Sequence, residues 1–437
     1  MASVSEIGQA METILSTRAN EMARATGFVK RNSKLTGAGF VQTTVIGWLQ
    51  NPDASYSTLT QTAASLGIQI SSQGLEQRFT PEAVSLLQAT LNAAVSQVMS
   101  AEPVAIPILE RFNGVILQDS SIINLPDALA AVWQGCRDGQ GGHTAALKIQ
   151  VRLDIRTGTL FGPLLEDGRT NDRGSPSQSA PVPAGALVLR DLGYFNLAQL
   201  RAYDAAGAFF LTRLLHNTGV FDEAGNRLDL RQVLEAVGDR VDLPVQIGTS
   251  EPLRVRLLAV RVPQEVADQR RRRLKFEARR RGQNISNERL ALASWTILVT
   301  NLRAEQLSLA EALVLARVRW QIELIFKLWK SHGKVDEWRT QKPQRILAET
   351  YAKLIAMVVQ HWLFLVMFWR YPNRSLVKAA QTVRSHAALL AAAFAGVLPT
   401  TAAIELIQRC LVAGCRMNPR KRQPNAYQLL LDLSDAA

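Results

Sequence analysis

The sequence predicts a multidomain α/β protein, and three observations support this fold class. Residues 1–107 show helical patterns, residues from about 112 to 300 contain short apolar runs typical of strands, and the chain from Ser308 onward is again helical. The chain has 437 residues, of which 47% are hydrophobic and 20% charged. This composition excludes a wholly disordered chain and allows a large core in several packed units.

The N-terminal region is expected to be entirely helical. Thr80 followed by Pro81 is a typical helix start, because threonine caps the first turn and proline is tolerated within it. Residues 62–68 and 71–79 predict two short helices joined by a glycine turn. This pattern fits a DNA-binding helix-turn-helix and a plain helical hairpin equally well.

Two aspartates follow short buried strands in the central region. The apolar run 115–117 ends close to Asp119, and the run 187–189 ends just before Asp191. Between them, residues 148–155 alternate polar and apolar side chains, which predicts a half-buried strand that turns at 156–159 and returns from Leu160. A helix is expected from Asn196 to Tyr203. A lone aspartate more often caps a turn, but carboxylates at strand ends can converge on a divalent cation.

Residues 204–300 again resemble strands, at 209–211, 254–262 and 295–300, and they enclose a basic segment. The twelve positions 270–281 contain eight positive residues and one acid, Glu277. The positive residues are Arg270, Arg271, Arg272, Arg273, Lys275, Arg279, Arg280 and Arg281. The segment is either a solvated charged helix or a surface that contacts the DNA backbone, and its charge density favours DNA.

The segment 316–330 predicts an amphipathic helix with one charged seam. At 100° per residue, Arg319, Glu323, Lys327 and Lys330 share one narrow stripe, and most of the remaining circumference is apolar. The purely structural interpretation is an Arg319–Glu323 ion pair on a solvated helix face. The apolar surroundings favour a functional seam instead, because a buried acid is costly unless it is paired or bound to metal.

The overall charge and the cysteines restrict the class of protein. The formal net charge of +13 points to a polyanionic partner, most often nucleic acid. Three cysteines without a CxxC pair argue against a zinc ribbon or a disulfide framework and suit a reducing cytoplasm. The most apolar segment, 354–369, is short for a membrane span, so we expect a buried core helix and no membrane partner.

Three ordered blocks resemble the DDE transposases of the insertion-sequence-four family, including the enzyme of the bacterial kanamycin-resistance transposon. The segment 118–121 is similar to the first-aspartate block, and 190–195 is similar to the second, written D-x-G-[YF]. Arg319, Glu323 and Lys330 match the Tyr-Arg-Glu-Lys signature. The resemblance implies a ribonuclease-H-like mixed-sheet core, interrupted by a β-rich insertion and flanked by helical N- and C-terminal domains.

The resemblance also implies five regions along the chain. These are a helical DNA-binding domain (1–107), the first part of the catalytic core (108–203), the β-rich insertion (204–300), the second part of the core (301–372) and a helical C-terminal region that would serve dimerisation (373–437).

The chemistry implied by the family is cut-and-paste transposition by two-metal-ion hydrolysis and strand transfer. Asp119, Asp191 and Glu323 would hold two Mg²⁺ ions, which Mn²⁺ could replace, while Arg319, Lys327 and Lys330 would contact phosphates. Trp295 would stack on a flipped base, or it is an ordinary core residue of a strand. The implied partners are double-stranded DNA, as terminal inverted repeats and target, and a second copy of the chain, in the nucleoid of a bacterial cytoplasm.

One position departs from the family signature, since Ala316 stands where the motif has tyrosine. The absence of the tyrosine hydroxyl predicts weaker positioning of the DNA end. The main alternative is a non-catalytic or decayed transposase-derived protein that only binds DNA, and a further one is an unrelated nuclease. Glu323 discriminates between the first two, because an acid that faces DNA phosphates would hinder binding unless a metal intervened.

Overall fold

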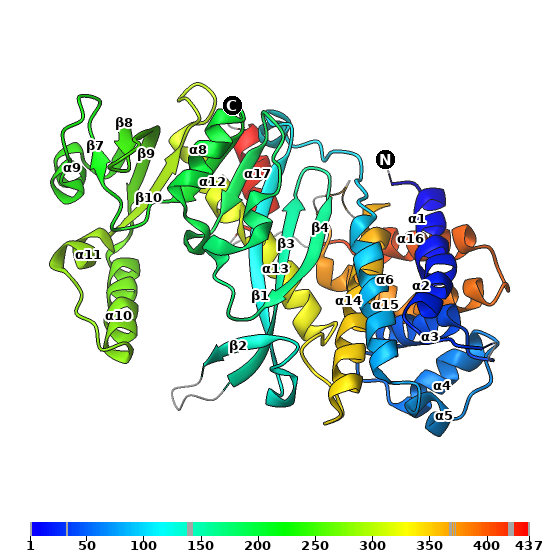
Figure 1. Ribbon diagram of the computed structural model, residues 1–437. Coiled ribbons are helices and arrows are strands. Elements are labelled where there is room, and N and C mark those ends of the chain that lie inside the picture. The colour runs from blue at the N-terminus through cyan, green and yellow to red at the C-terminus, as the bar shows by residue number, and fades with distance from the viewer. Residues whose placement is uncertain are drawn as a thin grey trace. The chain divides into compact units, whose positions relative to one another are not determined.

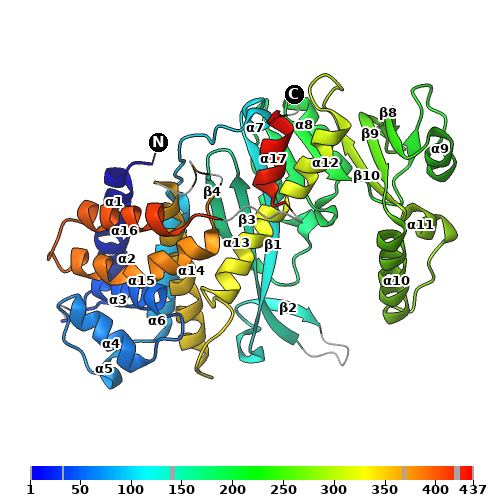
Figure 2. The same cartoon turned by 180° about the vertical axis from the view of Figure 1, so that it is seen from behind.

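The computed structural model describes residues 2–31, 34–137, 143–366, 369, 371, 373–417 and 424–435. The chain forms two compact units (Figures 1 and 2). The first unit contains Met1–Leu109, Asp119–Thr170 and Trp320–Gln428, and the second contains Glu110–Gln118, Asn171–Arg319 and Leu429–Ala437. Three of the five boundaries fall within α7 (Pro107–Glu110), β1 (Val115–Leu125) and α17 (Ala426–Asp435), and the other two lie after Thr170 and Arg319.

The first unit is mainly helical, and both its N-terminal and C-terminal helices belong to one body. Its helices are α1 (Val4–Glu12), a π-helical turn (Thr13–Arg18), α2 (Ala19–Ala25), α3 (Gly37–Gln50), α4 (Tyr56–Ser65), α5 (Ser72–Glu76), α6 (Pro81–Ser96), a 3₁₀ turn (Asp127–Leu129), α13 (Trp320–Ser331), α14 (Pro343–Leu365), α15 (Leu376–Phe394) and α16 (Thr400–Gly414). The predicted helix start at Thr80 is confirmed, since its side chain accepts a hydrogen bond from the Ala83 N–H at the head of α6.

The centre of the first unit is α14, the core helix expected at 354–369. It packs against α3 and α6, α15 packs against α3 and α16, and α1 packs against α16. Close approach of α3 to α2 depends on Gly37, because a Cβ there would lie 2.3 Å from the Cβ of Ala23. Residues far apart in the sequence therefore share one core.

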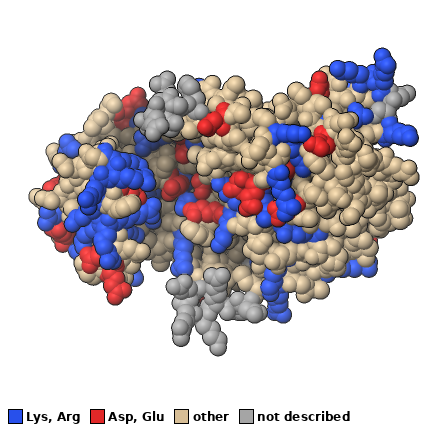
Figure 3. All heavy atoms as spheres, turned by 90° about the horizontal axis from the view of Figure 1, so that it is seen from below, with Lys and Arg blue, Asp and Glu red and all other residues tan. Residues whose placement is uncertain are grey.

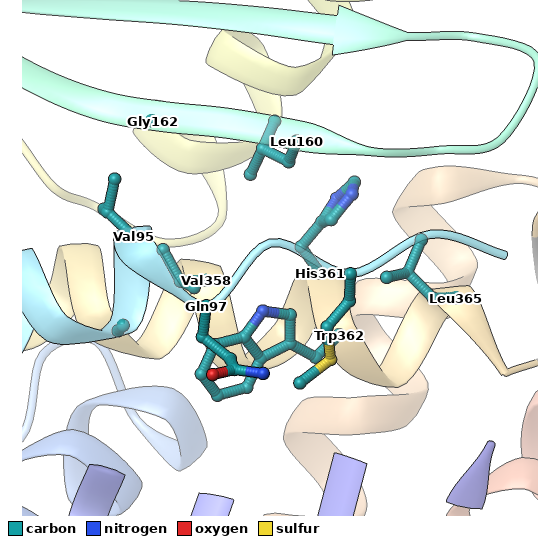
Figure 4. A pocket seen from close by; sticks show the side chains of 10 residues that line it. Val95, Gln97, Leu160, Gly162, Val358, His361, Trp362 and Leu365 are labelled. Atoms are coloured by element: carbon teal, nitrogen blue, oxygen red, sulfur yellow. The ribbon is translucent and has the colours of Figure 1, made fainter. Parts of the chain in front are cut away.

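His361 of α14 is completely buried and faces the strand that begins at Leu160, as Figure 4 shows. Its Nε2 lies 2.7 Å from the carbonyl oxygen of Gly158, so the ring donates there as a neutral imidazole. Burial lowers the pKa of His361 to about 4, and the Gly158 carbonyl offsets part of that shift. The cavity beside the ring measures only about 10 Å³.

The strands of the first unit lie in the order β2-β3-β1, with β4 on the side of β3. They are β2 (Gln134–Arg137), β3 (His143–Asp154), β4 (Leu160–Asp167) and the part of β1 from Asp119. The predicted strand and its return are confirmed. However, β3 is not half-buried: Lys148, Gln150 and Arg152 of its polar face are also buried. Lys148 donates to the Thr170 carbonyl, and the Arg152 guanidinium lies over the ring of Phe161.

The second unit carries the remainder of the mixed sheet, in the order β1-β5-β6-β10-β9-β8-β7. Its elements are three 3₁₀ turns (Asp172–Gly174, Pro176–Ser179 and Leu192–Tyr194), β5 (Leu187–Arg190), α8 (Leu197–Ala205), β6 (Phe209–Arg213), β7 (Val220–Phe221), α9 (Leu230–Val237), β8 (Arg240–Ile247), β9 (Leu253–Arg261), α10 (Gln264–Arg280), α11 (Asn287–Leu292), β10 (Trp295–Thr300) and α12 (Leu309–Val318). The strands expected at 187–189, 209–211, 254–262 and 295–300 and the helix after Asn196 are all present. The mixed α/β class is confirmed, with ten strands in the sheet.

The strand directions set where chemistry can gather in the second unit. β1, β5 and β6 are parallel, with Leu117 paired to Leu189 and Leu189 paired to Leu211, whereas β10 runs antiparallel to β6. The carboxyl ends of β5 and β6 therefore open on the same edge, next to the start of β10. In α/β sheets, such an edge is where ligands usually bind.

Two local expectations were wrong. Asp119 does not follow the end of its strand, because β1 continues to Leu125 and Asp119 lies within it, where burial changes from complete to partial. The segment 316–330 is not one helix, since α12 ends at Val318 and α13 begins at Trp320, with Arg319 as the C-cap residue.

Within the described residues, no helix has both the length and the apolar character that a membrane crossing requires.

Candidate active site

Asp191 occupies the position directly after β5, as predicted. β5 is buried along its whole length, and Asp191 begins the 3₁₀ turn Leu192–Tyr194, whose Tyr194 N–H donates to the backbone oxygen of Asp191 at 3.0 Å. The carboxylate itself makes no capping hydrogen bond. The Asp191 side chain therefore does not have the usual role of a turn aspartate, which is to cap the backbone N–H groups of its own turn.

A cavity of about 340 Å³ opens beside Asp191, entirely within the second unit. The ends of β5 and β6, the start of β10 and the last turn of α12 form its walls. Its polar lining consists of Arg190, Asp191, Thr212, Arg213, Thr296, Arg317 and Arg319. The structure thus brings Asp191 and Arg319, two of the predicted site residues, to one cavity.

The cavity is strongly positive, with four arginines and one acid in its lining. Arg190 is held in place, since its Nη1 donates to Gln178 Oε1 at 3.1 Å and its guanidinium lies 4.9 Å from the ring of Tyr203. Arg213 and Arg317 are exposed. Burial lowers the pKa of the neighbouring Arg270, and the charge of Arg213 lowers it further. A phosphate is the ligand that such a set of guanidinium groups favours.

Ala316 lines the same cavity. The family signature has tyrosine at this position, so the phenol of the usual residue would project from the last turn of α12. With alanine, that part of the wall is a methyl group.

Asp119 and Glu323 both belong to the first unit, on β1 and α13, which lie beside each other in Figures 1 and 2. Lys330 of α13 connects the two elements, because its Nζ donates to the carbonyl oxygen of Ile122 at 2.7 Å. Asp119 accepts the N–H of Ser120 at 2.8 Å, and Glu323 is partly buried between Ile322 and Ile325. Lys327 is exposed. In this arrangement, Lys330 supports the position of α13.

The donor set suits a hard cation, since carboxylate oxygens are the ligands that Mg²⁺ prefers. Among the residues that the structure describes, no three or more His, Cys, Asp or Glu side chains gather in a way that could hold a metal ion. Two of the three predicted ligands lie in the first unit, and Asp191 lies in the second.

Trp295 faces away from the cavity. Neighbouring side chains of a strand point to opposite faces, and Thr296 and Leu298 of β10 line the cavity. Trp295 is 6% exposed and belongs to the apolar core of the second unit. The Arg261 guanidinium lies over its ring, 4.5 Å from the ring centre. These contacts favour the core interpretation of Trp295, and its stacking role stays a prediction.

The basic segment forms the greater part of α10, and its arginines fall into two groups. Arg270 donates to the Trp295 carbonyl at 2.9 Å, and Arg271 donates to the Leu290 carbonyl at 3.1 Å, so both fasten the helix to the protein. The other six are exposed: Arg272, Arg273, Lys275, Arg279, Arg280 and Arg281. Figure 3 shows Lys and Arg side chains gathered over this part of the surface. Only the six exposed cations of the segment are accessible to a polyanion such as DNA.

The N-terminal region contributes nothing to the positive net charge. Residues 1–107 contain six Lys and Arg and seven Asp and Glu. The two short helices about Gly67 are present as α4 and α5, but α5 has only five residues and its Glu76 pairs with Lys342 at 2.7 Å. This favours the plain helical hairpin over a helix-turn-helix.

Sequence reasoning missed Arg213 and Arg317. Arg213 could have been found, because it ends the strand that begins at Phe209 and the ends of parallel strands meet at one edge. Arg317 offered no comparable signal in the sequence, and the structure places it in the last turn of α12, where it lines the cavity.

An acid at the end of a central parallel strand, beside a set of arginines of phosphate-binding type, fits an enzyme that acts on phosphate esters. Residues 110–359 match the family described as "Transposase DDE domain", and the chain belongs to this family. It is an insertion-sequence transposase by family, and the resemblance noted from the three sequence blocks is confirmed at this level.

Several curated transposases are similar to this chain over most of its length. The transposase for insertion sequence element IS231C of Bacillus thuringiensis subsp. berliner is 29% identical over 364 residues, which cover 78% of this chain and 75% of that protein. The one for IS231B is 26% identical over 363 residues, with the same coverage. The one for IS1151 of Clostridium perfringens is 23% identical over 365 residues, which cover 78% of this chain and 76% of that protein.

Proposed function

We propose that this chain cuts and rejoins DNA at the terminal inverted repeats of an insertion sequence, by a cut-and-paste route. The observation that carries the proposal is the cavity beside Asp191. This cavity is lined by Asp191, whose carboxylate makes no capping hydrogen bond, by Arg319 of the family signature and by exposed arginines. The chain that contains it is a member of the DDE family. Double-stranded DNA, as element ends and as target, is the proposed partner.

Asp119, Asp191 and Glu323 are the residues proposed to hold two Mg²⁺ ions, with Mn²⁺ as a substitute. When bound, the metal ions supply Lewis-acid activation of water and of a DNA 3′-hydroxyl for in-line phosphoryl displacement. Asp191 suits this role because its carboxylate faces the cavity rather than its own turn. Glu323 suits it because its carboxylate is partly buried on α13, where a bound cation would offset the cost of burying the charge.

The cationic residues are proposed to hold phosphates. Arg319, with Arg213 and Arg317, neutralises the phosphates nearest to Asp191, which keeps the scissile bond in place during reaction. Lys327, which is exposed, contacts the DNA backbone. Lys330 contacts a phosphate through the N–H donors of its ammonium group that the Ile122 carbonyl does not use.

Two further features of the family belong to the proposal. The segment 204–300 serves as the β-rich insertion into a ribonuclease-H-like core, and α10 projects its exposed arginines to DNA from it. Two copies of the chain pair the two element ends, through the helical C-terminal region 373–437. The site of action is the bacterial nucleoid.

Cleavage of DNA that carries the inverted repeats flanking the coding region tests the proposal. Wild type is run beside Glu323→Ala and a matched control, Glu12→Ala, whose acid is exposed on α1. We expect Mg²⁺-dependent nicking at the repeat boundary by wild type and the control, and a loss of about a thousandfold or more in Glu323→Ala with binding retained.

The alternative, a DNA-binding protein without catalysis, rests on the alanine in place of the signature tyrosine. It predicts that wild type binds the repeats and cuts nothing. Ala316→Tyr then distinguishes a disabled enzyme, which regains cleavage, from a protein with no catalytic role. If wild type already cuts, the added phenol should raise the cleavage rate about two- to tenfold, the worth of one hydrogen bond to DNA.

A further inference from the structure

The second half of α10 exposes an aromatic ring among its cations. Phe276 is 68% exposed, whereas Ala267 in the first half is completely buried. Arg272 lies one turn before Phe276 on the same face, and Arg279 and Arg280 lie one turn after it. The phenyl ring therefore projects from the middle of a positively charged surface.

The first half of α10 holds the helix in a fixed position on the second unit. The Arg270 guanidinium donates to the Trp295 carbonyl at 2.9 Å and to Thr296 Oγ1 at 3.1 Å. Arg271 donates to the Leu290 carbonyl at 3.1 Å and pairs with Asp268 at 2.8 Å. Phe276 is thus presented by a helix anchored on β10 rather than by a loop.

The local electrostatic potential is positive even at the single acid of this half. Glu277 accepts a hydrogen bond from Arg273 at 2.9 Å, which lowers its pKa, and the charges of Arg281 and Arg280 lower it further. An acidic surface or a phosphate backbone complements this face, whereas a plain apolar partner would leave the cations desolvated and unpaired.

We propose that Phe276 is a wedge that inserts between base pairs of double-stranded DNA while the neighbouring arginines hold the phosphates on either side. This inference deepens the proposed function, on which it rests, by naming a residue that deforms the DNA. Apolar side chains flanked by cations unstack a base step in this way, and the kink brings more of the duplex against the protein.

A duplex of the terminal inverted repeat with 2-aminopurine at successive positions tests the wedge. The experiment uses the full chain in EDTA, so that no cleavage occurs. Wild type should raise the fluorescence several-fold at one step, because an unstacked 2-aminopurine loses its quenching neighbour. Phe276→Ala should abolish that rise and weaken binding about tenfold, while Phe276→Leu should keep part of the rise.

Arg279→Ala is the matched variant for charge. It should keep the fluorescence rise at saturating protein and lower the slope of log affinity against log salt by about one, whereas Phe276→Ala should leave this slope unchanged. Phe276 is exposed, so we expect both variants to melt like wild type.

Two results with the Phe276→Ala variant would overturn the wedge. One is an unchanged fluorescence rise in Phe276→Ala, and the other is a change of its oligomeric state without DNA, which would mean that a second copy of the chain covers the ring. Mg²⁺-dependent cleavage by wild type is measured separately. Cleavage without a fluorescence rise rejects the wedge alone, whereas absence of both cleavage and binding rejects the proposed function.

Discussion

Two arginine–glutamate pairs of identical spacing lie on different helices of this protein. Arg345 and Glu349 pair at 3.3 Å on α14, with side chains only 6% and 4% exposed. Arg273 and Glu277 pair at 2.9 Å on α10, with side chains 82% and 38% exposed. The chemistry and the spacing are the same, so the surroundings alone distinguish the two pairs.

The buried Arg345–Glu349 pair is surrounded by aromatic rings and a second cation of the same unit. The Arg345 guanidinium lies among the rings of Trp48, Tyr56 and Phe79, at 4.6, 4.4 and 4.1 Å. Glu349 also pairs with Lys353 at 2.8 Å, and Lys353 donates to the carbonyls of Lys334 and Glu337. These charges are used within the protein, whereas the Arg273–Glu277 pair of α10 faces solvent. A cation available to DNA is therefore one that the fold does not itself require.

The largest expected effect comes from removing the two glutamates in turn. Glu349→Ala leaves Arg345 and Lys353 buried without their carboxylate, which should lower the free energy of unfolding by about 3–5 kcal/mol. Glu277→Ala should leave the unfolding midpoint unchanged, since water solvates Arg273. Chemical denaturation of both variants measures the difference, and equal losses would contradict the comparison.

His361 extends the comparison to a buried group that is held neutral. Its pKa is about 4 in the folded chain against an ordinary 6.5, so between these pH values the unfolded chain binds a proton that the folded chain does not. The free energy of unfolding should therefore fall by about 3 kcal/mol as the pH drops from about 6.5 to 4, and level off below.

Denaturation midpoints across this pH range measure the effect of His361. His361→Gln, which can still donate to Gly158, should lose this pH dependence. His216→Gln, in the second unit, serves as the control and should keep most of it, because burial lowers the pKa of the exposed His216 less than that of His361. A pH profile of His361→Gln that matches wild type would show that another group is responsible.

The smallest effect is expected for an exposed arginine of the cavity. Arg213→Ala should lower kcat/KM for cleavage of the repeat about tenfold, because one charge-assisted contact to phosphate is lost, with no change in the unfolding midpoint. Arg240→Ala, an exposed arginine of β8 outside the cavity, is the control. A loss of stability in Arg213→Ala would place it with the structural arginines instead.

The parts of the fold that sequence predicted are those with strong local signals. Asp191 was placed correctly because Arg190 ends a strand whose residues are all buried. Thr80 was placed correctly because capping depends on neighbours three residues away. Local periodicity and caps are read directly from the order of residues.

The errors arose where tertiary packing overrides a local pattern. β1 continues past Asp119 because strand pairing supports polar residues that the apolar run does not include. The polar face of β3 is buried against groups such as the Phe161 ring and the Thr170 carbonyl, which are not adjacent to it in sequence. The arginines of the cavity come from three separate segments, so only the parallel register of β5 and β6 could unite them.

The shared core of the terminal helices has a consequence for synthesis of the protein. α3 is buried from Gly37 to Leu49, and it packs against α14 and α15, which the ribosome adds about 300 residues later. At about 5–20 residues per second, the nascent chain exposes this apolar helix for tens of seconds. A fragment that ends before Pro343 would keep it exposed permanently. Interrupted translation therefore yields an aggregation-prone or chaperone-bound product, and premature stops in the gene should remove the folded N-terminal helices together with the catalytic region.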